Sequence, residues 1–124
     1  MPPEAHDAAQ IHDMIRAGEG LLRHVAGRSR GDLDTNEMLR DAMERKIEII
    51  GEAARSISDK FIEAHPEIPW RKIMATRHIL AHDYDEVNYD IVWQIAIEHV
   101  PQMLGQLRTL LPPPPPDPEP ENRI

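Results

Sequence analysis

The stretch LRDAMERKIEIIGEAARSISDKF, residues 39–61, carries the clearest folding signal in the chain. Its apolar residues recur at steps of three and four, the spacing that places side chains on one face of an α-helix. The residues of this face are Leu39, Ala42, Met43, Ile47, Ile50, Ala54, Ile57 and Phe61. Because such a face must be covered by other elements, the stretch predicts one long helix of a helical bundle.

The long helix is expected to begin at Asp34 and to run towards Ala64. Asp34 and Glu37 have the spacing of a capping box, in which two side chains bond free N–H groups of the first turn. Gly51 lies near the middle of the helix, where glycine costs about 1 kcal/mol relative to alanine. Since two alanines follow closely, Gly51 is expected to permit the close approach of a neighbouring helix.

Three further helices are predicted from the same periodicity and from turn-forming segments between them. Their expected ranges are residues 4–26, 69–84 and 89–111. Pro101 falls inside the last of these and is expected to kink it, because proline has no backbone N–H to donate. Short connections between four main helices favour an all-α fold, an up-and-down antiparallel bundle.

The chain is expected to form one helical domain over residues 1–111, followed by a tail. Residues 112–124 contain the unbroken run Pro112–Pro116 and three acidic residues, a composition typical of an extended or disordered segment. The absence of cysteine excludes a disulfide framework and a thiolate zinc site. No apolar run reaches the roughly 18 residues of a membrane span, so no membrane partner is expected and the cytoplasm is the default location.

The formal net charge of -8 argues against binding nucleic acid by overall charge. A polyanion would have to be met at a local site, and residues 70–82 offer one because they contain no acid. The basic and titratable residues of this segment are Arg71, Lys72, Arg77, His78 and His82.

Placed on a helix, Arg77 falls in the middle of an apolar stripe. The stripe consists of Trp70, Ile73, Leu80 and Tyr84. A guanidinium there is costly unless it meets an anion or a carboxylate. His78 and His82 lie one turn apart on the flank of the same face, within reach of a shared ligand. This face therefore has the groups needed to hold a phosphate and to move protons around it.

Other interpretations of these residues remain open. Arg77 could pair with a carboxylate such as Glu52 of the long helix, and Tyr84 could be an ordinary core aromatic. His78 and His82 have the spacing of metal ligands on a helix, but Ile79 stands where the zinc-protease motif has glutamate. No other cluster of ligands accompanies them, so neither a metal nor another cofactor is predicted.

Arg77, His82 and Tyr84 have the spacing Arg-x4-His-x-Tyr, which is similar to the signature of the HepT-like toxins, proteins that carry HEPN domains. Three more segments match that family in order, and the resemblance spans about residues 7–111. They are residues 50–54 (IGEAA), 66–70 (PEIPW) and 92–93 (VW).

The resemblance implies a HEPN-like helical fold and a homodimer in which two Arg-His motifs face one cleft. It implies a metal-independent endoribonuclease that cleaves RNA, not DNA, through attack of the ribose 2′-OH. Such a protein is the toxin of a type VII-like two-gene module. Its partner is a minimal nucleotidyltransferase (MNT) antitoxin that attaches AMP to the motif tyrosine.

Carried over residue by residue, the resemblance implies that Arg77 and His82 are catalytic and that Tyr84 is the AMPylated position. His78 stands where the family commonly has asparagine, and a supporting role is expected for it. The alternative is a non-catalytic module whose Arg-His face docks and controls a nucleotidyltransferase partner. The apolar face of the predicted third helix, with Trp70, Ile73 and Leu80, is expected to bury part of the dimer surface.

Overall fold

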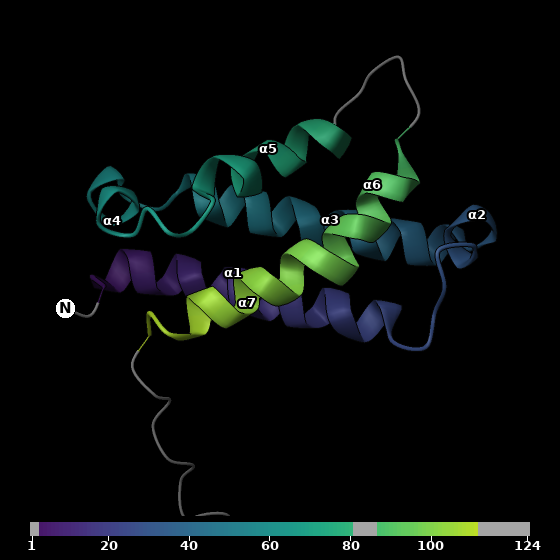
Figure 1. Cartoon of the computed structure of the whole chain (residues 1–124), viewed down its shortest axis with the longest axis horizontal. Helices are drawn as coiled ribbons and strands as arrows, with labels where there is room; N and C mark the ends of the chain where they lie inside the picture. Colours follow the sequence, from purple (N-terminus) through teal and green to yellow (C-terminus); the bar gives the residue numbers. More distant parts are fainter. Residues whose placement is uncertain (1–2, 81–86, 112–124) are drawn as a thin grey trace, which may run out of the picture.

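The computed structural model describes residues 3–80 and 87–111, and within these ranges every regular element is helical. The elements are α1 (Ala5–Val25), α2 (Asp32–Thr35), α3 (Glu37–Arg55), α4 (Asp59–Ala64), α5 (Trp70–Leu80), α6 (Tyr89–Gln94), the π-helical turn η1 (Ile95–His99) and α7 (Val100–Arg108) (Figure 1). Because α6, η1 and α7 are continuous, the main units are four helices, as predicted.

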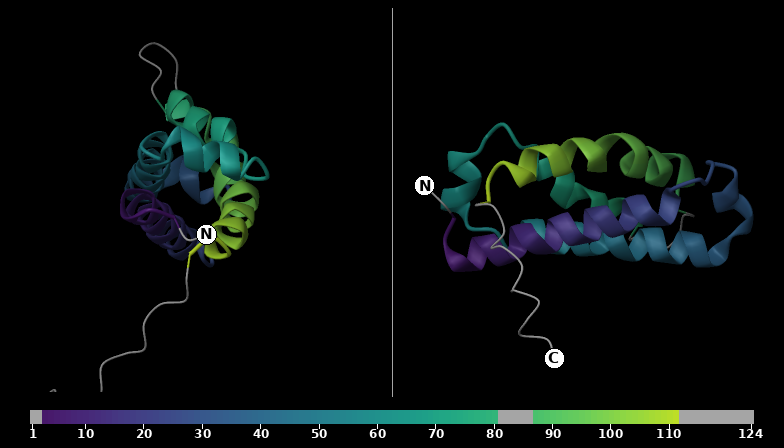
Figure 2. Two further views of the ribbon diagram at one scale, coloured as in Figure 1. Left: turned by 90° about the vertical axis from the view of Figure 1, so that its left-hand side faces the viewer. Right: turned by 90° about the horizontal axis from the view of Figure 1, so that it is seen from below.

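The four units run alternately in opposite directions and surround a shared core (Figures 1 and 2). The most extensive contacts join α1 to α3 and α3 to α5, while α7 packs against α1. Within the described residues, no comparable contact joins α5 to α6, η1 or α7. The bundle is therefore more loosely closed between α5 and the last helix than elsewhere.

The core is aliphatic, as the small number of aromatic residues predicts. The largest side chains that are fully buried are Ile11, Met14, Leu21, Leu33, Met43, Ile47, Val92, Leu104 and Leu107. They come from α1, the α2 turn, α3 and the last helix, so burial of their aliphatic surface against one another stabilises the bundle. No helix in the described ranges combines the length and apolar character that a membrane crossing requires.

The predicted start of the long helix at Asp34 is wrong. Asp34 belongs to the short α2 turn, and α3 begins after Asn36, whose side chain accepts a hydrogen bond of 3.0 Å from the Leu39 N–H. Asn36 has extended backbone angles (φ -113°, ψ 92°), which separate the two helices. An asparagine N-cap therefore replaces the predicted Asp34–Glu37 capping box.

The predicted continuation of the long helix to Ala64 is also wrong, because α3 ends at Arg55 and α4 begins at Asp59. Ser58 caps α4, accepting a hydrogen bond from the Phe61 N–H. The N–H and the hydroxyl of Ser58 both donate to the carboxylate of Asp7, at 2.8 and 2.7 Å. Asp7 is buried on α1, so a carboxylate distant in the sequence satisfies the polar groups of this break.

The irregularity expected near Pro101 takes the form of a wide helical turn directly before it. In η1 the hydrogen bonds span five residues, and the Val100 N–H reaches the carbonyl of Ile95. Pro101 follows this turn directly, inside the continuous last helix, where proline leaves one backbone hydrogen bond unmade.

Candidate functional site

The beginning of α5 is fixed by Trp70, which is 3% exposed. Its indole N–H donates a hydrogen bond of 2.9 Å to the carbonyl of His65, and its ring meets Phe61 edge-on. The helix begins directly after Pro69, whose carbonyl accepts from the Ile73 N–H. The segment PEIPW therefore sets the position of α5 on the bundle.

Arg77 lies across α3 at Gly51. A Cβ atom built on Gly51 would be 2.7 Å from Cγ of Arg77, closer than a real carbon contact allows. Gly51 is buried, so its missing side chain makes room for the aliphatic stem of Arg77. The expectation that Gly51 permits the close approach of a neighbouring helix is confirmed, and the neighbour is α5.

The guanidinium of Arg77 has no carboxylate partner within the described part of the chain. Glu52, the partner considered from the sequence, is exposed and forms no ion pair with Arg77. Arg77 itself is half-buried. A half-buried cation on a tightly packed helix, with no carboxylate neutralising it in residues 3–80 and 87–111, can receive an external anion.

The remaining motif residues are placed only in part. His78 follows Arg77 on α5 and is exposed. His82 and Tyr84 lie outside the described residues, so the geometry of the complete Arg-His-Tyr set is not given by the structure. In the described ranges, no group of three or more histidine, aspartate or glutamate side chains is placed to hold a metal ion.

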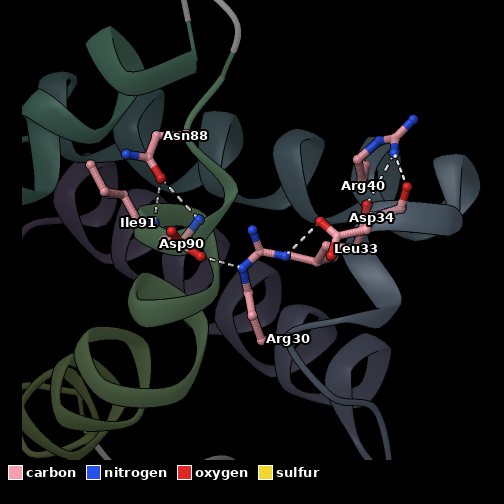
Figure 3. A network of polar contacts seen from close by, with 7 residues as sticks. All are labelled: Arg30, Leu33, Asp34, Arg40, Asn88, Asp90 and Ile91. Carbon is pink, nitrogen blue, oxygen red and sulfur yellow. Dashed lines mark hydrogen bonds and ion pairs between the residues drawn. The ribbon is translucent and has the colours of Figure 1, made fainter.

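The start of α6, shortly after the motif segment, is held by a network of polar contacts (Figure 3). The side chain of Asn88 accepts from the N–H groups of Asp90 and Ile91, at 3.0 and 3.3 Å. Arg30 donates to Asp90 at 2.6 Å and to Asp34 at 3.0 Å, and these hydrogen bonds raise the pKa of Arg30 above its usual value. The network joins the loop after α1 to the start of α6.

A second arginine, Arg40, also contacts the start of α6. Arg40 on α3 donates to the carbonyl of Leu33 at 3.0 Å, and its guanidinium carbon is 5.5 Å from the centre of the Tyr89 ring (Figure 3 shows the Leu33 bond). Sequence reasoning missed both arginines as structural residues. The only local signal was the spacing of Arg30 and Asp34, four residues apart.

Comparison with known proteins gives the family. The model of the family described as "Ribonuclease HepT-like" matches residues 14–110. The chain belongs to the HepT-like ribonuclease family. The protein named Putative RNase TTE0752, from Caldanaerobacter subterraneus subsp. tengcongensis, is 33% identical over 101 residues, which are 82% of this chain and 90% of that protein.

Other members of the HepT-like family are similar to this chain. Putative RNase MJ1380 of Methanocaldococcus jannaschii is 33% identical over 95 residues, covering 77% of this chain and 87% of that protein. Probable ribonuclease HepT of Thermococcus cleftensis is 39% identical over 69 residues, or 56% and 63% of the two chains. No solved structure matches.

In this HepT-like chain, a cavity of about 310 Å³ lies between α5 and the last helix. We call it the α5–α7 groove. Its lining residues are Ile47, Ile50, Pro69, Lys72, Ile73, Ala75, Thr76, Ile79, Ile91, Ile95, His99, Val100, Gln102, Met103 and Gln106. Arg77 is not among its lining residues, but its neighbour Thr76 is, and Thr76 Oγ1 also lies 3.5 Å from a Cβ atom built on Gly51.

Of the three residues expected at a dimer surface, Trp70, Ile73 and Leu80, the first two are wrong, while Leu80 is half-buried. The side chains of Trp70 and Ile73 are buried within the chain, at 3% and 8% exposure, so they are not available to a second copy. The periodicity marked them correctly as apolar, but it could not distinguish burial within the bundle from burial between chains. The large apolar side chains that are exposed in the described part of the last helix are Ile91 and Ile97.

Proposed function

We propose that this chain is a metal-independent endoribonuclease and the toxin of a type VII-like HEPN/MNT module, with Arg77 and His82 as its catalytic residues. The observation that carries the proposal is the placement of Arg77, which lies over Gly51 with no carboxylate partner in the described residues. Membership of the HepT-like ribonuclease family supports RNA as the substrate. Relatives named as RNases support it further.

The proposed chemistry uses the 2′-OH of the RNA as the nucleophile. His82 removes its proton or protonates the leaving 5′-oxygen, since an imidazole titrates near neutral pH. Arg77 stabilises the negative charge that develops on the phosphorane oxygens. In a homodimer with a shared cleft, two copies of His82 divide the acid and base roles, and the exposed His78 supports phosphate binding beside Arg77.

The proposed regulation is the attachment of AMP to Tyr84 by an MNT-type antitoxin. AMP adds bulk and negative charge close to the catalytic arginine, so it blocks the site and repels the RNA phosphate. Mass spectrometry after co-expression tests this step. Each transferred AMP should add the mass of one nucleotide unit, and Tyr84→Phe should abolish the addition. An adduct on Tyr89, which packs beside Arg40, would contradict the assignment.

The cleavage proposal is tested by expressing the chain alone and as Arg77→Ala and His82→Ala. Growth arrest and RNA loss should disappear in both variants, and the purified protein should give 2′,3′-cyclic phosphate and 5′-OH ends in the presence of EDTA. Arg55→Ala is the matched control, because Arg55 is an exposed arginine outside the segment 70–82. Cleavage that requires an added divalent metal would overturn the mechanism.

The second candidate is a non-catalytic module that docks a nucleotidyltransferase. The net charge of -8 favours it, because a negatively charged chain repels a free RNA strand. In that case the chain alone causes no arrest and cleaves no RNA. Arg77→Ala then weakens binding to the partner without any loss of RNA cleavage.

A further inference from the structure

Helix α5 is basic in an acidic chain. It contains three basic residues and no acid, whereas α1 and α3 each contain more acidic than basic residues when histidine is counted as neutral. The chain as a whole has a net charge of -8. The positive charge of α5 is therefore local, and it attracts a polyanion to one helix of a chain that otherwise repels it.

Arg71, Ala75 and His78 lie on one face of α5. At about 100° per residue, the three side chains leave the helix within about 60° of one another. All three are exposed, while Ile73, on the opposite side of the helix, is buried. We call these three residues the outer face of α5. The small side chain of Ala75 leaves the space between Arg71 and His78 open to a ligand.

The charge of Arg71 is not neutralised within the described residues, where it forms no ion pair. The acid nearest to it in the sequence is Glu67, and that carboxylate contacts His65 at 3.2 Å instead. Arg71 is therefore available to an external anion. The planar guanidinium of arginine suits a phosphate, because it donates two parallel hydrogen bonds to it.

The outer face continues the site from Arg77. Around the helix, His78 follows Arg77 by about 100°, and Arg71 lies only about 20° further. Along the helix axis, Arg71 and Arg77 are about 9 Å apart, so the two guanidinium groups meet different phosphates of a strand. A strand with one phosphate at Arg77 can thus pass over His78 and reach Arg71 with another.

We infer that the outer face of α5 binds a single strand of RNA beside the phosphate held at Arg77, with Arg71 as the contact of a second phosphate. This inference rests on the proposed function for its ligand. The contact lies one residue from Trp70, which fixes the beginning of α5, so the strand meets a firmly placed part of the chain. Such a row of basic side chains follows the backbone of a single strand without reading its sequence.

Binding of an uncleavable 2′-O-methyl RNA to the full chain, followed by fluorescence anisotropy, tests the contact. Arg71→Ala should weaken binding about tenfold, and should reduce the slope of log Kd against log salt concentration by about 0.7, because one phosphate contact is lost. Arg71→Lys should retain most of the slope. Arg55→Ala is the matched control, since Arg55 is an exposed arginine at the end of α3. Equal effects of Arg71→Ala and Arg55→Ala would show attraction by overall charge and would overturn the inference.

Neutral methylphosphonate groups, placed at one phosphate of the RNA at a time, locate the two contacts. One position should weaken binding to the unchanged chain but not to Arg71→Ala, and a different position should behave in this way with Arg77→Ala. A single shared position, or none, would overturn the inference. So would absence of RNA binding, and if Arg71→Ala then lost a protein partner, the outer face would be a protein docking surface.

The failures of this inference and of the proposed function are distinguishable, because the probe cannot be cleaved. A chain that binds RNA through Arg71 but fails the cleavage test contradicts the proposed function alone. A chain that cleaves RNA, and whose Arg71→Ala variant binds the probe as tightly as the unchanged chain, contradicts this inference alone.

Discussion

Helix α5 is packed in opposite ways against its two neighbours, α3 and the last helix. On the side of Arg77, α5 lies so close to α3 that Gly51 has no space for a single additional carbon. Towards the last helix, next to Ile79, a cavity of about 310 Å³ separates the two elements. We call these the closed side and the open side. The difference indicates that the two contacts of one helix differ in rigidity, since tight packing fixes the arginine and the open side leaves Ile79 only half-buried.

The largest effect is expected at Trp70, which fixes the beginning of the closed side. Trp70→Ala should lower the free energy of unfolding by about 3–5 kcal/mol, because it leaves a cavity at a fully packed position. Trp70→Phe should cost less, since it keeps a buried ring and loses mainly the hydrogen bond to His65. Urea unfolding followed by circular dichroism measures both values. Equal losses for the two variants would contradict this account of Trp70.

A smaller loss of stability, accompanied by loss of function, is expected at Gly51. Gly51→Ala should lower stability by about 1–3 kcal/mol, because the new methyl group overlaps the stem of Arg77. The arginine must then move, so RNA cleavage should fall as well. Unfolding and cleavage assays on the same preparation measure the two effects.

Gly105→Ala is the matched control for Gly51. Gly105 lies within α7, and outside the backbone of its own helix a Cβ atom there would meet nothing within 4 Å. The substitution should therefore raise stability by about 0.5–1 kcal/mol through the better helix propensity of alanine. If both glycine substitutions change stability in the same direction, the closed side is not as tightly packed as described.

The smallest effect is expected on the open side. Ile79 is half-buried and borders the groove, so Ile79→Ala should cost no more than about 1 kcal/mol. Ile73→Ala removes the same atoms from a side chain that is 8% exposed, and should cost about 2–4 kcal/mol. Thermal unfolding of the two variants measures their losses of stability. A larger loss at Ile79 would show that the open side is covered in solution.

The sequence predicts the number and order of the main helices because each carries a sustained apolar face. It also predicts the close approach at Gly51, since glycine in a helix interior is unfavourable without a packing reason. The break at Ser58 is missed because the apolar pattern continues across it to Phe61, and the break at Asn36 is missed because Asp34 and Glu37 have the spacing of a capping box. The break at Ser58 depends on Asp7, about fifty residues away, and no local pattern reveals such a contact.

The sequence identifies candidate site residues only where they lie close together in the chain. Arg77, His78 and His82 are singled out because they stand together in an acid-free segment, whereas their roles in the reaction and the AMPylation of Tyr84 remain predictions from the family resemblance. The α5–α7 groove is not predictable, because its residues come from segments far apart in the chain. The bridge from Arg30 to Asp90 likewise depends on the complete fold.

The π-helical turn Ile95–His99 has a consequence for the length of the last helix. A π turn contains about one residue more than an α turn, and one residue corresponds to a rotation of about 100°. Without this turn, the buried residues Leu104 and Leu107 would be rotated by about 180° and about 120° from Ile95, which faces the same core. Removal of a single residue from the turn should therefore leave a regular helix whose second half still faces inward. The last helix can thus exist in two lengths, one residue apart, around the same core.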